Sequence, residues 1–563
     1  MIKNLCINNF RSFSKEQNIP IKPITLVYGA NSVGKSSVLK SLLLMKQTLE
    51  KTTDPNSDLL TKGNYVDVGN YKDFINQQDI SKNFSIKFNF DISSTTEESK
   101  HIRLPNYRFN RIKNINYLSI EYIYSHNNSK NGILTAIKLY LNNSSEPFLK
   151  LKKSAKKLEP KSFRKIRMRS IQTLKNVDDI DSLFVLEYID WDSAYFNEFL
   201  KYAEEKIKKS KTNDKIKQMI FSLTERINKV EEKDEQQQTL FGENKNELSK
   251  KLKFYNELND LLCDTSTFKE KIINLITKYY ETNMFLFINL LFYDEYNNID
   301  DNYNIMSALF RSRFRPLFYE DNIELNLNFN QEISDMLYLS CHLVQQYLTN
   351  MRYIGALRDN PERYYLSNPS TKNYVGKSGK NTIDIVAKNI TFKNKINKQL
   401  EALNIGYILV PRKIPNEDIY LFLLKEKDSG ITVSLNDIGF GVSQILPILV
   451  QSMLSEDETI IIEQPEIHIH PKLQAELGTL FAECIKEPYN NHFIIETHSE
   501  NIILRLQKLI RKNVISNNDV AVIYVDKNIN GATCLNLRLD KNGNFIDKWP
   551  NGFFEESFEE IFG

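Results

Sequence analysis

Apolar residues are spaced as in strands and helices toward both ends of the chain. Ile24–Tyr28 is a short, β-branched and apolar run, typical of a buried parallel strand, and Ser37–Leu49 carries apolar residues at helical spacing. Phe84–Ile92, Tyr117–Tyr124 and Ile133–Leu141 also have strand character, and Asn- and Ser-rich separators between them favour antiparallel connections. The first part of the chain therefore predicts a parallel strand, a helix and a set of antiparallel strands.

The last part of the chain shows a similar alternation. We expect strands at Tyr407–Val410, Ile419–Leu424, Ile431–Leu435, Thr459–Ile462, His492–Ile495 and Val520–Val525. Helices are expected over Pro471–Ile485 and Glu500–Arg511. Because apolar strands that alternate with helices are typical of α/β domains, α/β is the predicted fold class.

The middle of the chain has helical character. Residues 195–280 are rich in Glu, Lys, Gln and Leu with few glycines, and Ile333–Met351 is a further helical stretch. No heptad repeat is sustained enough to predict a coiled coil. We therefore expect an N-terminal lobe over residues 1–155, a mostly helical insertion over 156–345 and a C-terminal lobe over 346–563.

The composition excludes several classes of protein. With 41% hydrophobic and 26% charged residues, the chain of 563 residues is neither disordered nor a membrane protein. Its longest apolar run, Met284–Tyr293, is far shorter than the ~20 residues that a bilayer needs. Five scattered cysteines without a CxxC pair argue against a disulfide scaffold and fit a reducing cytosol. We expect a cytoplasmic protein, and its net charge of +3 indicates no partner.

Residues Gly29–Ser36 fit the phosphate-loop pattern G-x-x-x-x-G-K-[ST] between an apolar strand and a helix. Glycines let backbone N–H groups turn toward phosphate oxygens, Lys35 adds a positive charge, and the Ser36 hydroxyl can ligate Mg²⁺. The alternative is a glycine-containing turn without a ligand. The predicted nucleotide-binding residues are Asn31, Ser32, Val33, Gly34, Lys35, Ser36 and Ser37.

A second candidate site element is the strand that ends in Glu463. A buried strand that delivers an acid at its carboxyl end suits a Mg²⁺ site beside a phosphate loop, although it can also be a core strand ending in a surface acid. Glu463 and Glu466 precede His468 and His470, so a zinc site is an alternative. We favour polar packing at a nucleotide-dependent interface, because no further ligand follows at a suitable spacing.

His498 follows a second buried strand, and four of the seven histidines lie between His468 and His498. A histidine at the end of a strand beside the strand of Glu463 can reach a γ-phosphate or polarise the attacking water. The alternative is a histidine with a purely structural role.

Together these motifs resemble the ABC-type ATPases of the SMC and RecF class, most closely its OLD-like bacterial branch. Five motifs occur in the expected order: Asn9–Phe13, Gly29–Ser36, Asn436–Pro447, Glu463–Pro471 and Glu496–Glu500. The resemblance covers roughly residues 1–150 and 346–563. It implies an ABC/SMC-head-like P-loop ATPase fold, split by the insertion, with ATP and Mg²⁺ as cofactors.

The resemblance also implies a homodimer, or a higher homo-oligomer, in which ATP lies between the phosphate loop of one chain and the signature of the other. Gly439, Gly441 and Ser443 would contribute to that signature, while Asn436, Asp437 and Ser443 all stay candidates for its serine. A glycine-rich turn into a helix aims N–H groups at an anion. The alternative is an ordinary loop and helix start.

One departure from the wider class concerns Gln464, which occupies the position of the catalytic glutamate. An amide can orient water but cannot take its proton, and losing a general base typically costs ~10²–10⁴-fold in rate. Either Glu466 or His498 substitutes as the base, or the ATPase is slow and works as a switch. The predicted catalytic residues are therefore Glu463, Gln464, Glu466 and His498.

A second departure is that too few residues follow His498 for the Toprim domain of OLD nucleases. The segments Tyr353–Arg358 and Asn542–Phe562 resemble the nuclease-free ATPases of anti-phage systems such as Septu and some retrons. This resemblance implies a sensor or regulatory subunit that controls a separate, HNH-type nuclease, with no nuclease activity in this chain. A RecF-like DNA-repair ATPase without an effector is the alternative.

Two basic segments are candidate contacts for DNA or RNA. Lys150–Lys175 contains eleven Lys or Arg residues and one acid, a local excess of +10. Such residues release counterions from phosphates, although a solvated loop or a contact with an acidic partner also explains the charge. Phe310–Arg315 is a shorter candidate.

Overall fold

The structure is a computed structural model of the chain. It describes residues 2–51, 59–93, 115–126, 131–153, 183–190, 212–231, 329–360, 362–366, 374–438, 440–529 and 531–550, with a few further positions between 192 and 287.

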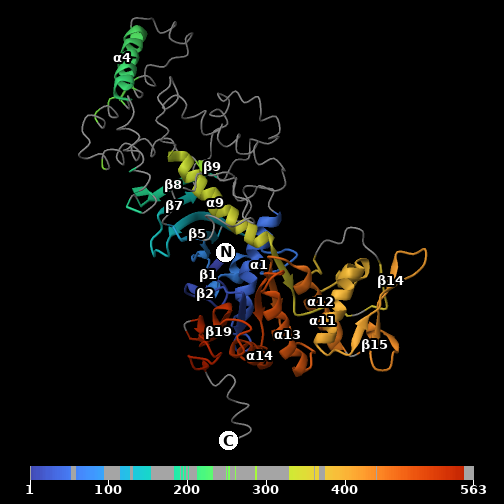
Figure 1. The fold of residues 1–563 in the computed structure, drawn as a ribbon. Helices are drawn as coiled ribbons and strands as arrows, with labels where there is room; N and C mark the ends of the chain where they lie inside the picture. Colours follow the sequence, from blue (N-terminus) through green and yellow to red (C-terminus); the bar gives the residue numbers. More distant parts are fainter. Residues whose placement is uncertain are drawn as a thin grey trace.

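A six-stranded sheet forms the centre of the molecule, in the order β10-β17-β18-β3-β19-β20. Its strands are β3 (Ile24–Tyr28), β10 (Met351–Ile354), β17 (Thr459–Glu463), β18 (His492–Glu496), β19 (Val520–Asn528) and β20 (Gly531–Leu537). All neighbours pair in parallel except β19 and β20. Strand β3 thus lies between two strands from the last part of the chain, and the predicted α/β class is confirmed. In Figure 1 the first part of the chain, in blue, accordingly lies beside the last part, in red.

Both faces of this sheet are buried, as the unbroken apolar runs of its strands require. Along β17, Ile461 packs into one core, while Ile460 and Ile462 pack into the other. The first core contains α1 (Lys35–Lys51) and α9 (Phe329–Thr349). The second contains α12 (Phe440–Leu454), α13 (Pro471–Cys484) and α14 (Glu500–Arg511). The predicted helices over Pro471–Ile485 and Glu500–Arg511 are confirmed.

An eight-stranded antiparallel sheet covers the first core. In spatial order its strands are β2 (Gln17–Pro20), β1 (Ile2–Asn8), β4 (Phe84–Asp91), β5 (Tyr117–His126), β6 (Gly132–Leu141), β7 (Leu149–Lys153), β8 (Leu183–Ile189) and β9 (Leu286–Phe287). The antiparallel connections predicted for β4, β5 and β6 are confirmed.

Strands β8 and β9 belong to the range 156–345, for which the sequence predicts mostly helix. The antiparallel sheet therefore continues past residue 155 into the predicted insertion. The same range also supplies α4 (Thr212–Glu231), which lies well away from the central sheet (Figure 1). The division into three parts stays a prediction.

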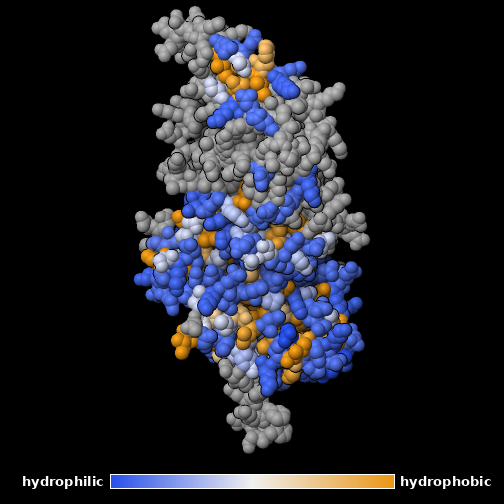
Figure 2. All heavy atoms as spheres, turned by 90° about the vertical axis from the view of Figure 1, so that its left-hand side faces the viewer, coloured by the Kyte–Doolittle hydropathy of each residue, from blue (hydrophilic) through white to orange (hydrophobic). Residues whose placement is uncertain are grey.

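Two small sheets stand beside α12. One contains β11 (Tyr364–Leu366), β13 (Arg412–Lys413) and β14 (Ile419–Leu421), and the other β12 (Tyr407–Leu409), β15 (Leu423–Glu426) and β16 (Thr432–Ser434). The short helices α10 (Thr382–Lys388) and α11 (Ile390–Ala402) accompany them, and α2 (Tyr71–Phe74) lies near the N-terminus. In Figure 2 the coloured part of the visible face is mainly hydrophilic, with apolar side chains gathered in small groups.

A buried lysine joins the phosphate-loop helix α1 to α9. Lys46 is 1% exposed, and its ammonium donates a hydrogen bond to the backbone carbonyl of Leu348 at 2.7 Å. Its second partner is the Glu50 carboxylate at 2.6 Å. A positive charge at the carboxyl end of α9 also complements the dipole of that helix.

We expect Lys46→Met to lower the free energy of unfolding by about 1–3 kcal/mol, because it leaves the buried Leu348 carbonyl without a donor. Urea denaturation followed by circular dichroism measures this change. The exposed Lys15 gives a matched control, Lys15→Met, with an expected change within about 0.5 kcal/mol. Equal midpoints for the two variants would contradict this account of the α1–α9 contact.

Candidate functional site

The phosphate loop connects β3 to α1 and is held between β19 and the turn at residues 11–12. Gly29 and Gly34 have φ values of +144° and +120°, a backbone conformation that residues other than glycine rarely adopt. A Cβ atom at Gly29 would lie 2.4 Å from the Val525 carbonyl oxygen, and one at Gly34 would lie 2.0 Å from Ser12 Oγ. The loop therefore requires glycine at both positions.

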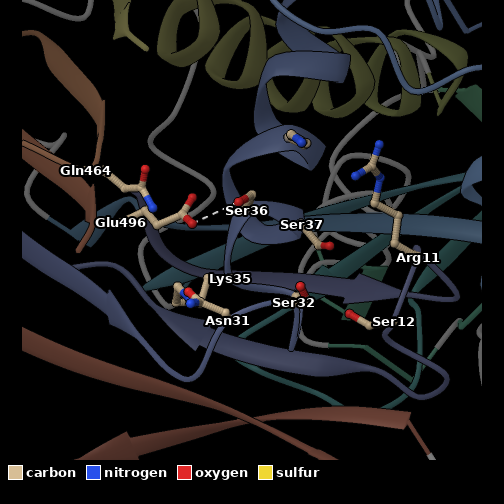
Figure 3. Close-up of a pocket in the computed structure, with 11 residues that line it drawn as sticks. Arg11, Ser12, Asn31, Ser32, Lys35, Ser36, Ser37, Gln464 and Glu496 are labelled. Atoms are coloured by element: carbon tan, nitrogen blue, oxygen red, sulfur yellow. Dashed lines mark hydrogen bonds between the residues drawn. The ribbon is translucent and has the colours of Figure 1, made fainter. Parts of the chain in front are cut away.

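A cavity of about 480 Å³ opens at this loop (Figure 3). Of the described residues, those that line it are Arg11, Ser12, Asn31, Ser32, Gly34, Lys35, Ser36, Ser37, Lys40, Gln464 and Glu496. Six of the seven residues predicted to bind nucleotide are among them. Val33, the seventh, instead packs partly buried against the first core.

Lys35 lies at the first turn of α1, within reach of the loop carbonyls. Its ammonium donates to the carbonyl oxygens of Gly29 at 3.0 Å and Ala30 at 2.7 Å. Burial lowers the pKa of Lys35, while the nearby carboxylates of Glu496 and Glu466 act in the opposite direction. These contacts place a cation inside the loop, where a phosphate group can replace the carbonyls.

Two acids stand next to each other at the carboxyl ends of β17 and β18, where Glu463 pairs in register with Glu496. Ser36 Oγ donates a hydrogen bond to Glu496 Oε1 at 2.8 Å (Figure 3). Burial is the main cause of the raised pKa of Glu496, and the charge of Glu463 adds to it. Glu463 Oε1 and Glu496 Oε2 are both buried without a hydrogen-bond partner.

Gln464 follows β17 in a left-handed backbone conformation, with φ of 43°. Such a conformation costs a non-glycine residue about 1–2 kcal/mol and persists where surrounding contacts hold it. The Gln464 N–H donates to the Glu496 carbonyl at 2.7 Å, and the Gln464 carbonyl accepts from the Arg358 guanidinium at 2.7 Å. These two contacts hold the backbone from which the Gln464 side chain reaches the cavity.

Arg358 connects this turn to α12. Arg358 is 5% exposed, and its guanidinium donates to the carbonyls of Glu463 at 3.3 Å and, more weakly, Gln444 at 3.4 Å. Burial lowers the pKa of Arg358 to about 10, which leaves it positively charged at neutral pH. The end of β17 and the helix that carries Gly441 and Ser443 are therefore joined through one side chain.

Glu466 and His498 are the two predicted substitutes for a catalytic base, and the Glu466 side chain binds the segment that carries His498. The Glu466 carboxylate accepts hydrogen bonds from the Thr497 hydroxyl and the His498 N–H, both at 2.7 Å. Burial raises the pKa of Glu466 and lowers that of His498, whose Nε2 is buried without a hydrogen-bond partner. Neither residue lines the cavity in the described part of the chain.

The signature residues lie at the start of α12. Gly441 approaches the loop after β17 so closely that an added Cβ would lie 2.9 Å from the His468 carbonyl oxygen. Ser443 is 7% exposed, and Gly439 lies outside the described residues. The two described residues do not line the cavity of their own chain.

His468 and His470 have local structural positions. His468 has a left-handed backbone, with φ of 60°. His470 caps α13, because its Nδ1 accepts a hydrogen bond from the Lys472 N–H at 3.2 Å. Within the described ranges, no group of three or more His, Cys, Asp or Glu residues is placed to hold a metal ion, so the zinc alternative has no support there.

Sequence reasoning missed four residues that line the cavity: Arg11, Ser12, Lys40 and Glu496. The first two lie in the Asn9–Phe13 motif, and Arg11 adopts a left-handed backbone with φ of 51°. Glu496 ends an apolar strand just as Glu463 does, and this parallel was the signal available in the sequence. Arg358 was also missed as a site residue. Apart from its place in the Tyr353–Arg358 segment, the surrounding sequence does not indicate its contacts.

Most of the basic segment Lys150–Lys175 lies outside the described residues, as does Phe310–Arg315. Its first residues are in β7, where Lys150 and Lys152 lie 2.8 Å and 3.9 Å from carboxylate oxygens of Glu187. The Glu187 carboxylate on β8 thus compensates part of the positive charge at the start of this segment. None of the helices in the described ranges is long and apolar enough to cross a membrane.

We expect Arg358→Met to lower the free energy of unfolding by about 1.5–3 kcal/mol, because buried carbonyls lose a charged donor. Chemical denaturation measures the loss. Arg363→Met is the control, since Arg363 is exposed in the same segment. If both substitutions leave the unfolding midpoint unchanged, Arg358 does not hold the turn after β17.

Comparisons with known proteins find SMC head domains among the solved structures, at low similarity. The Smc head domain from Pyrococcus furiosus, whose structure includes an extended coiled coil and the bound C-terminal domain of ScpA, is 11% identical, covers 100% of this chain and 99% of its own, and has a TM-score of 0.35. The SMC head domain from Thermotoga maritima is 9% identical over 96% of this chain and 99% of its own, with a TM-score of 0.33. Scores this low support no argument, so the fold rests on the strand pairing described above.

No curated protein sequence matches the chain. A family model described as "Protein of unknown function (DUF3696)" matches residues 515–562. A second model, described as "AAA ATPase domain", matches residues 1–503, and this range contains the phosphate loop and both acidic strands. Because that match covers most of the chain, the protein belongs to the AAA ATPase domain family.

Proposed function

We propose that this chain binds ATP with Mg²⁺ in the phosphate-loop cavity and hydrolyses it slowly, as a switch rather than a rapid motor. The observation that carries the proposal is the cavity itself. It brings the loop amides, Lys35, Ser36 and two strand-end positions, Gln464 and Glu496, to one edge of the central sheet. The positive end of α1 points at the same place, where it favours an anion.

The donor set fits Mg²⁺, which prefers oxygen ligands and usually takes few from the protein and the rest from phosphates and water. Ser36 and Glu463 are the proposed ligands. Glu463 Oε1 is buried without a hydrogen-bond partner, which supports this assignment because a bound cation would give that oxygen a contact. When bound, the ion would neutralise negative charge on the phosphates. Lys35 and the loop N–H groups would hold and orient them.

Gln464 is the proposed reason for slow turnover. Its amide reaches the cavity, where it can orient a water molecule, but it cannot accept that water's proton. Glu466 is a poor substitute, because Thr497 and His498 already donate to its two oxygens. His498 remains a proposed contact for the γ-phosphate, since its Nε2 has no partner in the described structure.

The proposed active form is a dimer in which Gly439, Gly441 and Ser443 of one chain meet the nucleotide of the other. Gly441 and Ser443 lie outside the cavity of their own chain, which supports contact from a second copy. Arg358 would then connect that contact with the turn of Gln464, because its guanidinium reaches carbonyls on both sides.

We expect Gln464→Glu to raise the steady-state ATPase rate by at least about tenfold, because it supplies a general base at the water-orienting position. The same substitution should shorten the lifetime of the ATP-induced dimer, measured by light scattering after removal of free ATP. Gln78→Glu is the control, since Gln78 is exposed and does not line the cavity. An unchanged rate in Gln464→Glu would refute the proposed role of Gln464.

At the level of the cell, we propose a sensor or regulatory subunit of an anti-phage defence complex that controls a separate nuclease. The support is the resemblance of Tyr353–Arg358 and of the C-terminal segment to nuclease-free defence ATPases. Its Arg358 lies in the described site, where ATP-dependent movement of α12 would be transmitted. The basic segment Lys150–Lys175 is the proposed contact for nucleic acid or for the partner.

Purification together with the product of the neighbouring gene tests this role. We expect co-elution with a nuclease, and loss of phage protection in Lys35→Ala, since this change removes the loop's cation. Lys15→Ala serves as the exposed control and should keep protection. A chain that purifies alone and whose ATPase is stimulated by gapped DNA would refute the defence role and favour a RecF-like repair ATPase.

A further inference from the structure

We propose that Glu496 is a direct ligand of the divalent cation in this site, beside Ser36 and Glu463. This inference rests on the proposed ATP–Mg²⁺ function and adds a residue that the phosphate-loop and strand motifs do not assign. Four structural observations support it.

The first is the strand order. β18 lies directly beside the phosphate-loop strand β3, where Glu496 is in register with Val27. β17 is separated from β3 by β18, so Glu496 lies between Glu463 and the strand that leads into the phosphate loop. An acid at the end of β18 is therefore closer to the phosphates than the acid at the end of β17.

The second is the contact with Ser36. Glu496 Oε1 accepts the Ser36 hydroxyl hydrogen at 2.8 Å, and both side chains line the cavity, whereas Glu463 does not (Figure 3). In P-loop proteins this hydroxyl is a cation ligand. A carboxylate within hydrogen-bond distance of it occupies the space in which the ion's other oxygen ligands must lie.

The third is that an oxygen of each acid has no partner. Glu496 is 5% exposed, and both its Oε2 and Glu463 Oε1 are buried without a hydrogen bond. Two adjacent carboxylates with buried oxygens repel each other, and either a nearby positive charge or protonation must offset this repulsion. A divalent ion placed between them would compensate both.

The fourth is that Lys35, one of the two lysines that line the cavity, binds other groups. The Lys35 ammonium donates to the carbonyls of Gly29 and Ala30, at 3.0 Å and 2.7 Å. On binding nucleotide this ammonium is expected to turn to the phosphates. Lys40 also lines the cavity, but within the described residues neither lysine forms an ion pair with Glu496. A metal ion would supply the close positive charge that Glu496 lacks.

The test uses Mn²⁺ as the probe and the full-length chain. Free Mn²⁺ is measured by electron paramagnetic resonance during titration of the ADP-saturated protein, so the readout does not depend on hydrolysis. We expect Glu496→Gln to weaken Mn²⁺ binding at least about tenfold, with Glu496→Asp in between. ADP affinity in EDTA should be unchanged. Glu500→Gln, a neighbouring charge-matched control that does not line the cavity, should bind Mn²⁺ as the original chain does.

A second readout separates a ligand from a merely structural acid. Without metal, Glu496→Gln should have a melting temperature equal to or above that of the original chain, because it relieves repulsion with Glu463. Adding Mn²⁺ and ADP should raise the melting temperature of the original chain more than that of Glu496→Gln. Equal Mn²⁺ affinity in the original chain and in Glu496→Gln would overturn the role of Glu496 as a ligand but leave the proposed ATP-binding function standing. An original chain that binds neither ADP nor ATP would overturn the proposed function itself.

Discussion

The parallel pairing of β3 with β18 and β19 is the constraint on which the site depends. The phosphate loop is encoded near the N-terminus, while both acids and Gln464 are encoded more than four hundred residues later. Only the insertion of β3 into the C-terminal strands brings Ser36 within 2.8 Å of Glu496. Because parallel strands end at the same edge of a sheet, every strand-end acid is delivered to the loop by this pairing. The two buried cores then hold the sheet from both faces.

Local features were accessible from the sequence for a physical reason. The phosphate loop needs glycine at two positions with positive φ, and that need is written within eight residues. The start and end of α14, Glu500–Arg511, follow from its Ser499 cap and its strong apolar periodicity. Apolar runs such as Thr459–Ile462 predict buried strands because both faces of the sheet exclude water.

Contacts that depend on strand order were not accessible in the same way. Glu463 and Glu496 look equivalent in the sequence, since each ends an apolar strand, and only the order β17-β18-β3 places Glu496 against Ser36. Glu466 was a candidate base, yet its oxygens are engaged by Thr497 and His498, which is a tertiary contact without a sequence signal. The antiparallel sheet also extends into the predicted insertion through β8, an apolar strand that pairs with β7.

The long sequence separation between β3 and its neighbours has a consequence for biosynthesis. During translation β3 emerges early, but β18 and β19 are completed only when the ribosome reaches residues 496 and 528. Contacts of this range form late and slowly, since loop closure precedes any gain from them. A nascent or truncated chain therefore has an apolar strand without neighbours and a phosphate loop without acids. A chain that stops before β18 lacks Glu496, one of the residues that line the cavity, so the complete cavity forms only after this strand has been made.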